Sequence, residues 1–226
     1  MTRLLLVNPN TSVATTDAMC RIAGAQAGAG VEIVGLTARR GAPLITDEAA
    51  LIGAAGAVLA LAAEIEAMGS DGVIVSAFGD PALEELRLRL SCPVTGIAEA
   101  AMAAAAAGGR RFAIVTTTPD LADAVAAKAV AYGHAAEFCG VFLTTGNLHQ
   151  VMGDPAMLVE SLAKACILAV SAGAGAIVIG GGPLAQAALA LEGRFGVPII
   201  QPVPEAVRLA LARAAKAEPA SAAARH

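Results

Sequence analysis

Aromatic residues are scarce in this 226-residue chain, at 3% of the sequence, and tryptophan is absent. Charge is scarce as well: 15% of the residues are charged, the formal net charge is −4, and the basic residues form no run. Proteins that bind nucleic acid or anionic membranes present basic surfaces, often with aromatic side chains that stack on bases. The composition therefore argues against nucleic acid and against a membrane surface as partners.

Cysteine is limited to four residues, Cys20, Cys92, Cys139 and Cys166, with no C-x-x-C pair and no metal-ligand spacing. This pattern predicts free thiols in a reducing cytoplasm and no metal site. The first apolar run is too short for a signal peptide. Glycines and Pro183 interrupt the long uncharged stretch 166–191, so we expect a helix end, a buried strand and a new helix there instead of a membrane span.

Apolar residues are abundant, at 57%, as expected for parallel strands that helices cover on both faces. Two stretches, Gly72 to Leu83 and Ala176 to Leu184, each join three β-branched residues to small residues and a proline. We call the turn 76–82 the first elbow and the turn 180–184 the second elbow. Both are predicted to follow a buried strand at the edge where open α/β sheets bind ligands. In the first elbow, Asp80 is predicted to be an N-cap and Pro81 the first helical residue.

The two halves of the chain repeat one order of elements. Val7 and Val75 are 68 residues apart, and the corresponding Val115 and Ile179 are 64 apart. We therefore expect an α/β fold of two pseudo-symmetric parallel-sheet subdomains, 1–98 and 99–203, with the ligand site in the cleft between them. A C-terminal helix over 204–216 is a candidate to complete the first subdomain, and 217–226 is predicted to be a disordered tail.

Three further segments bear on function. The first strand ends at Asn8-Pro-Asn-Thr-Ser, a turn rich in helix-capping side chains. One helix is expected from a Thr46 cap to Met68. Thr144–Gly153 is predicted to be the longest polar loop, and it contains His149.

The motifs Asn8-Pro-Asn-Thr-Ser, Phe78-Gly-Asp-Pro, Gly96-Ile-Ala-Glu-Ala-Ala-Met and the turn 180–184 resemble the aspartate/glutamate/hydantoin racemase superfamily, with the hydantoin and allantoin branch closest. The resemblance implies a cofactor-free enzyme that moves an α-proton between two cysteine thiols, one at each elbow. Here the positions of those cysteines are occupied by Ala77 and Gly181. Neither residue carries a proton, so the resemblance implies the fold and the cleft without the usual two-thiol chemistry.

What remains at the turns is a set of hydrogen-bond donors suited to carbonyl or carboxylate oxygens. The predicted substrate-binding groups are the side chains of Asn10, Ser76, Thr116 and Thr117 and the backbone N–H groups of Phe78, Gly79, Gly181 and Gly182. The alternative is that Asn10 and the threonines only cap helices.

Three side chains are candidates for catalysis, and each has a structural alternative. Ser76 is a candidate nucleophile if a base lies within reach. Asp80 is a candidate acid or base, or simply a helix cap. His149 is a candidate base on a closing loop, or simply a surface histidine.

The sequence therefore favours a cofactor-independent enzyme of the racemase and isomerase superfamily. Its expected substrate is a small carbonyl-containing or cyclic-amide molecule. The alternatives are a cofactor-free lyase or a hydrolase that uses Ser76, Asp80 or His149, and a pseudoenzyme that binds a metabolite without chemistry. The apolar, weakly charged composition also predicts a homo-oligomer.

Overall fold

The computed structural model describes residues 1–223 and contains two four-stranded parallel sheets. The chain forms two compact units. Unit 1 comprises Met1–Ile45, Ala49–Ile97 and the chain from Val203 onward, and unit 2 comprises Thr46–Glu48 and Ala98–Pro202. The chain thus leaves unit 1 and returns to it for the last helix.

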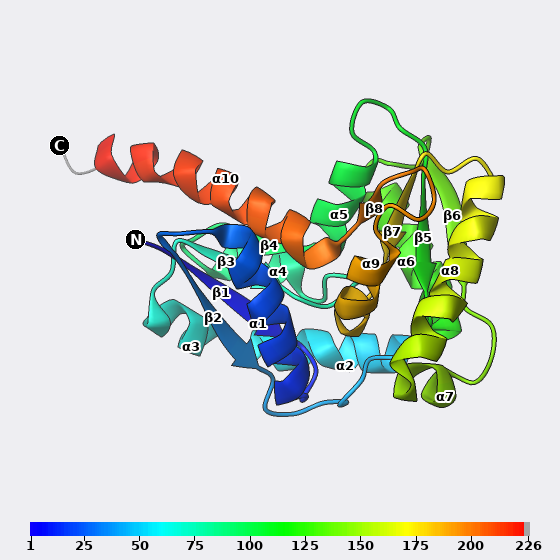
Figure 1. The fold of residues 1–226 in the computed structure, drawn as a ribbon. Helices are drawn as coiled ribbons and strands as arrows, with labels where there is room; N and C mark the ends of the chain where they lie inside the picture. The colour runs from blue at the N-terminus through cyan, green and yellow to red at the C-terminus, as the bar shows by residue number, and fades with distance from the viewer. Residues whose placement is uncertain (224–226) are drawn as a thin grey trace. The chain divides into compact units, whose positions relative to one another are not determined.

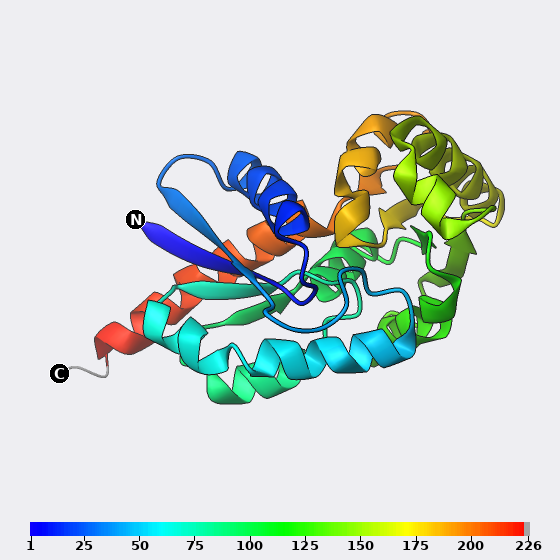
Figure 2. The same cartoon turned by 90° about the horizontal axis from the view of Figure 1, so that it is seen from below.

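Unit 1 is a doubly wound sheet with strand order β2-β1-β3-β4 (Figure 1). Helix α1 lies on one face and α2 and α3 on the other, as Figure 2 shows. The last helix lies beside α1, because Arg208 Nη2 donates to Gln26 Oε1 at 3.1 Å. The elements are β1 (Thr2–Asn8), α1 (Val13–Ala27), β2 (Val31–Thr37), α2 (Glu48–Leu59), α3 (Ala62–Met68), β3 (Gly72–Val75), α4 (Leu83–Arg89), β4 (Val94–Gly96) and α10 (Pro202–Ala223).

Unit 2 repeats this plan with strand order β6-β5-β7-β8. Its elements are α5 (Ile97–Ala105), β5 (Phe112–Thr116), α6 (Ala122–Ala131), β6 (Phe138–Leu143), α7 (Leu148–Gly153), α8 (Pro155–Ser171), β7 (Ala176–Ile179), α9 (Ala185–Leu191) and β8 (Ile199–Ile200), with 3₁₀ turns at Pro119–Leu121 and Gly182–Leu184. Helices α8 and α9 pack on one face of the sheet through an apolar core. The predicted pair of parallel-sheet halves is confirmed.

The strand register brings the functional turns together within each unit. Val7 pairs with Val75 in unit 1, and Val115 pairs with Ile179 in unit 2. Because the strands are parallel, the turn after β1 lies beside the first elbow, and the turn after β5 lies beside the second elbow. Each sheet thus carries its candidate residues at a single edge.

Four predicted details differ in the structure. The helix expected from Thr46 to Met68 begins at Glu48 and is broken at Ala60 and Leu61, which bends α3 from α2 by 44°. The predicted loop 144–153 contains α7, because the Asn147 side chain accepts from the backbone N–H groups of His149 and Gln150 and so caps a helix. Helix α10 continues to Ala223, into the predicted tail, and residues 224–226 lie outside the described residues.

The fourth difference concerns the first elbow. Asp80 is not an N-cap and Pro81 is not in the helix, because α4 begins only at Leu83. The elbow is a longer turn than the sequence predicted, and its backbone is left-handed at two non-glycine residues, Asp80 with φ 49° and Ala82 with φ 60°.

Over residues 1–223, no single helix is long and apolar enough to cross a membrane. The bent pair α2 and α3 meets that criterion jointly, by length and composition alone.

Candidate functional site

A buried asparagine pair shapes the turn after β1 in unit 1. Asn8 is fully buried, and its Nδ2 donates to Asn10 Oδ1 at 2.9 Å and to Thr16 Oγ1 at 3.0 Å. Asn8 Oδ1 in turn accepts from the backbone N–H of Asn10 at 3.1 Å. The Ser12 side chain caps α1 by accepting from Thr15 N. The turn is therefore held by its own polar side chains.

The Asn10 side chain is fixed with its nitrogen unused. Its Oδ1 accepts from Asn8 Nδ2 and also from Ser12 N at 2.9 Å. Asn10 is 5% exposed, and within residues 1–223 its Nδ2 has no hydrogen-bond partner. The Asn10 Nδ2 atom is not fully buried, so it can be reached from outside the protein. An amide with its oxygen held and its N–H₂ unpaired is a preoriented donor. A role in capping alone would therefore explain the bonds of the Asn10 side-chain oxygen but not the unpaired nitrogen.

Ser76 has a structural bond in the first elbow. Its Oγ donates to the Val7 carbonyl at 2.8 Å, and the residue is 2% exposed. This hydrogen bond therefore holds the first elbow against the end of β1. A nucleophilic serine donates this proton to a general base, whereas here a backbone carbonyl accepts it.

The first elbow has two left-handed non-glycine residues, each of which costs about 1–3 kcal/mol. The Asp80 backbone N–H donates to the Ala77 carbonyl at 3.0 Å. The Asp80 side chain is buried over β4: a Cβ placed on Gly96 would lie 2.2 Å from Asp80 Cγ. Gly96 is therefore required to make room for this carboxyl group.

The tip of the first elbow presents free backbone donors. Phe78 and Gly79 are buried, yet in the part of the chain that the structure describes their N–H groups have no acceptor. Gly79 has φ 125°, a conformation that other residues rarely adopt, and it lies against Leu51 of α2. Unpaired buried N–H groups are rare in proteins and suggest that a ligand or water accepts from them.

In unit 2, the threonines after β5 are buried and have different partners. Thr116 Oγ1 shares a hydrogen bond with Thr118 Oγ1 at 3.2 Å, and Thr117 Oγ1 donates to the Met152 sulfur at 3.8 Å. A thioether is a weak acceptor. The Thr117 hydroxyl is therefore easily redirected to a better acceptor.

The second elbow matches the first in its donors. The N–H groups of Gly181 and Gly182 have no acceptor among the residues that the structure covers. Gly181 has φ 147°, and a Cβ there would lie 3.3 Å from the Leu184 side chain. This turn therefore resists any side chain at position 181.

His149 lies in the first turn of α7 and is exposed. Its backbone N–H donates to Asn147 Oδ1 at 3.0 Å, and across residues 1–223 no hydrogen bond or ion pair involves its imidazole. Among the described residues, His149 thus has no partner that would orient it as a base.

The family model for Asp/Glu/Hydantoin racemase matches residues 4–210. The chain belongs to this family. Hydantoin racemase of a Pseudomonas species is 27% identical over 92% of this chain and 84% of its own length. Hydantoin racemase of Paenarthrobacter aurescens is 29% identical over 92% of this chain and 89% of its own length. The structure of allantoin racemase from Klebsiella pneumoniae is 33% identical, covers 94% of this chain and 87% of its own, and has a TM-score of 0.88. The predicted hydantoin and allantoin branch of the racemase family is confirmed.

The four thiols of this racemase-family chain lie away from both elbows in sequence. Burial raises the pKa of Cys166 to about 12, and the charge of Arg194 acts in the opposite direction. Burial is also the main cause that raises the pKa of Cys20 and of Cys92. All three are therefore protonated at neutral pH, unlike a thiol that acts as a base.

In this family member, no three His, Cys, Asp or Glu residues within the described range are grouped to hold a metal ion. Sequence reasoning missed Asn8, which holds Asn10, and Thr37, whose Oγ1 is 2.6 Å from Thr16 Oγ1. The Asn-Pro-Asn motif was the available signal for Asn8. No local signal identified Thr37.

Proposed function

We propose that this racemase-family chain binds a small cyclic ureide of the hydantoin or allantoin class and acts on it without a cofactor. In this proposal, the unpaired backbone donors of the first elbow and the Asn10 amide, all in unit 1, hold a carbonyl oxygen of the substrate. The chemistry is abstraction and return of the proton on the carbon next to a carbonyl, without thiols at positions 77 and 181.

The observation that carries the proposal is the pair of unpaired backbone N–H groups at the first elbow, with the Asn10 amide beside them. Loss of an α-proton places negative charge on the adjacent carbonyl oxygen. Preorganised donors stabilise that charge more strongly than the neutral carbonyl, so they lower the barrier. Removing one such donor typically reduces the rate by about 10²–10³-fold.

The proton carrier is the distinctive part of this proposal. Ala77 and Gly181 have no ionisable group, and the Ser76 hydroxyl is engaged in a hydrogen bond to the Val7 carbonyl. Within the first elbow, Asp80 is the one residue with an ionisable side chain. We therefore assign Asp80 the acid–base role to be tested, with the isosteric Asp80→Asn variant as the decisive change.

The test is hydrogen–deuterium exchange at the stereocentre. Single enantiomers of 5-substituted hydantoins and of allantoin are incubated with the protein in D₂O, and NMR and polarimetry follow exchange and racemisation against a protein-free control. We expect protein-dependent exchange that Asp80→Asn abolishes. Exchange no faster than in the control, across the whole panel, would refute the catalytic proposal.

Asn10→Asp separates binding from folding in the same experiment. The substitution keeps Oδ1 for Asn8 and Ser12 and replaces the unpaired Nδ2 donor with an anionic oxygen. We expect the substrate Kd to rise about tenfold or more. Because an unpaired carboxylate at a buried residue also lowers stability, the Tm is measured with the Kd so that binding is compared only in folded protein. An unchanged Kd would exclude Asn10 as a substrate donor.

Ala77→Cys tests the geometry of the first elbow. Ala77 is half-buried and lacks the positive φ of Asp80 and Ala82, so its backbone conformation does not disfavour a larger side chain. We expect faster exchange in Ala77→Cys than in Ala77→Ser, because serine has the same shape but far weaker acidity. Equal rates in the two variants would mean that the elbow does not present this position to substrate.

A second candidate function is ureide binding without chemistry. The absence of an ionisable group at both 77 and 181 specifically favours it. Calorimetric binding of a ureide with no exchange in D₂O would select this function over catalysis.

A further inference from the structure

The buried face of α2 begins with a leucine that stays partly open. Residues 51, 54 and 58 have the spacing of a single helix face, and Ala54 and Val58 of that face are buried. Leu51 belongs to the same face but is only half-buried. Part of its side chain is therefore available to something outside the core.

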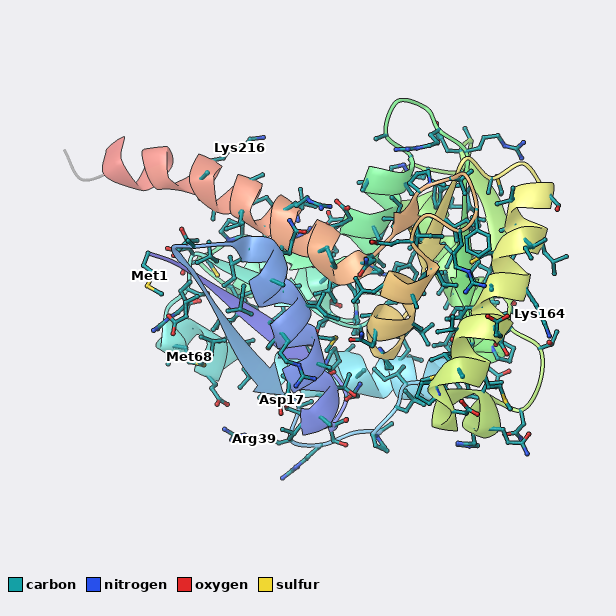
Figure 3. All side chains as sticks on the ribbon, in the orientation of Figure 1. Met1, Asp17, Arg39, Met68, Lys164 and Lys216 are labelled. Atoms are coloured by element: carbon teal, nitrogen blue, oxygen red, sulfur yellow. The ribbon has the colours of Figure 1, made fainter. Side chains whose placement is uncertain are left out.

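Leu51 lies toward the edge of the sheet that carries the first elbow. In Figure 3, Met68 at the end of α3 lies near Met1, and its carbonyl accepts from Arg3 Nη1 at 3.3 Å at the start of β1. Figure 3 shows Arg39, which follows the end of β2, at the opposite edge. Helices α2 and α3 therefore end at the amino edge of the sheet, and the first turns of α2 lie toward its carboxyl edge.

The Leu51 side chain covers one residue of the first elbow. A Cβ built on Gly79 would lie 3.2 Å from Leu51 Cδ1 and 3.3 Å from Leu51 Cδ2. Both methyl groups therefore face the side of Gly79 on which any other residue would carry a side chain. Among the described residues, the N–H of Gly79 has no acceptor. Gly79 thus combines an unpaired donor with an apolar cover.

One small molecule can touch both the donor and its apolar neighbour. An acceptor oxygen lies about 2.9 Å from the nitrogen that donates to it, and a Cβ lies about 2.5 Å from the nitrogen of its own residue. With the distance from that Cβ to Leu51, these lengths keep a bound oxygen within about 9 Å of both methyl groups. An isobutyl group on the carbon beside a carbonyl reaches about 5 Å from the oxygen and contacts other carbons at about 4 Å. It therefore bridges this distance.

We propose that Leu51 contacts the substituent on the carbon next to the bound carbonyl and makes the site selective for apolar alkyl substituents. This role rests on the proposed function, in which donors of the first elbow hold the carbonyl oxygen. An alkyl group that covers the Leu51 methyl groups removes apolar surface from water, whereas a carboxylate there loses hydration without gaining a partner. Ligand sites commonly join an apolar wall to a few oriented polar groups in this way.

The charged alternative on α2 is a pair of arginines on another face of the helix. Arg39 and Arg40 line a hollow of about 470 Å³ together with Gly53 of α2. Gly53 lies about 200° around the helix from Leu51, at about 100° per residue. Arg39 is also paired with Glu64 at 2.8 Å. The face of α2 that covers Gly79 is therefore the apolar one, which favours an alkyl substituent over an anionic one.

Calorimetric binding of three ligands tests the proposal: unsubstituted hydantoin, 5-isobutylhydantoin and 5-(2-carboxyethyl)hydantoin. We expect the wild type to bind the isobutyl compound about tenfold more tightly than either of the others. Leu51→Ala should lose most of this preference and leave the Kd of unsubstituted hydantoin nearly unchanged. Ile52→Ala is the matched control, because Ile52 is the next residue of α2 and is 68% exposed, and it should keep the wild-type ratios.

The outcomes separate this proposal from the proposed function. A wild type that binds no ureide would overturn both. If ureides bind and Leu51→Ala shifts all three Kd values alike, or none of them, Leu51 only packs against Gly79 and the selectivity proposal alone fails. Tightest binding of the carboxyethyl compound by the wild type would overturn it in favour of the two arginines. Melting temperatures are measured throughout, and Leu51→Val, with an intermediate expected loss of preference, replaces Leu51→Ala if that variant does not fold.

Discussion

At the scale of single residues, polar side chains with similar sequence signals have different roles. Asn10 and Ser76 both stand at the end of a strand and were both predicted to bind ligand. The structure leaves the Asn10 nitrogen unpaired, whereas the Ser76 hydroxyl donates to the Val7 carbonyl. The sequence showed the Asn-Pro-Asn turn but not the partner of Ser76, because a carbonyl 69 residues away has no sequence signature.

Cys166 gives a residue-scale prediction for alkaline pH. Burial raises its pKa from 9.0 to about 12, so from about pH 9 the unfolded chain loses the thiol proton while the folded chain keeps it. Unfolding is therefore increasingly favoured between pH 9 and 12, with a slope of up to about 1.4 kcal/mol per pH unit from this group. Below pH 9 the thiol is protonated in both states and has no pH effect.

Urea unfolding of wild type and Cys166→Ala at a series of pH values measures this contribution. The variant loses buried volume and should be less stable at pH 7. The gap between the two proteins should narrow as the pH rises above 9, because only the wild type has the titrating thiol. A gap that stays constant to pH 11 would contradict the assignment.

At the scale of elements, the strands followed from sequence better than the turns. Runs of β-branched residues predict β3 and β7. The register of these strands places the turn after β1 beside the first elbow and the turn after β5 beside the second elbow. The elbow between β3 and α4 was predicted as a simple N-cap and is a longer turn with left-handed Asp80 and Ala82. Tertiary packing of the Asp80 carboxyl over Gly96 overrides the local Asp-Pro preference for starting a helix.

Two glycines give an element-scale prediction with a built-in control. Gly181→Ala should lower the free energy of unfolding by about 1–3 kcal/mol, because φ 147° disfavours a side chain and the new Cβ meets Leu184 at 3.3 Å. Gly24→Ala, in α1 with open space around it, should raise the free energy of unfolding by about 0.5–1 kcal/mol. Chemical denaturation of the two variants checks the opposite signs, and a stabilising Gly181→Ala would show that the turn relaxes easily.

At the scale of the whole molecule, the repeat was readable from spacing, since both halves adopt the same strand order. The sequence makes the C-terminal helix only a candidate to complete the first subdomain. The pattern of apolar residues shows that this helix has a buried face, but it does not show which sheet that face covers. In the structure, α10 buries Val203, Ala206, Val207 and Ala210 and is tied to β4, where Arg213 Nη1 donates to Thr95 Oγ1 at 3.0 Å.

Unit 1 should therefore fail to fold without its last helix. A chain that stops after Gln201 is expected to lose its cooperative thermal transition or to aggregate, because the apolar surface of unit 1 that α10 covers beside α1 is left exposed. Val207→Ala is the graded control, with an expected loss of about 2 kcal/mol and a retained fold. Differential scanning calorimetry and circular dichroism distinguish these outcomes, and a truncated chain with wild-type Tm would refute the requirement for α10.

The conformation of Gly181 has a consequence for how this scaffold can be re-engineered. A new reactive group at position 77 needs only an exchange of side chain, whereas at 181 it also carries the strain of a backbone at φ 147°. Installing one group is thus far easier than installing two.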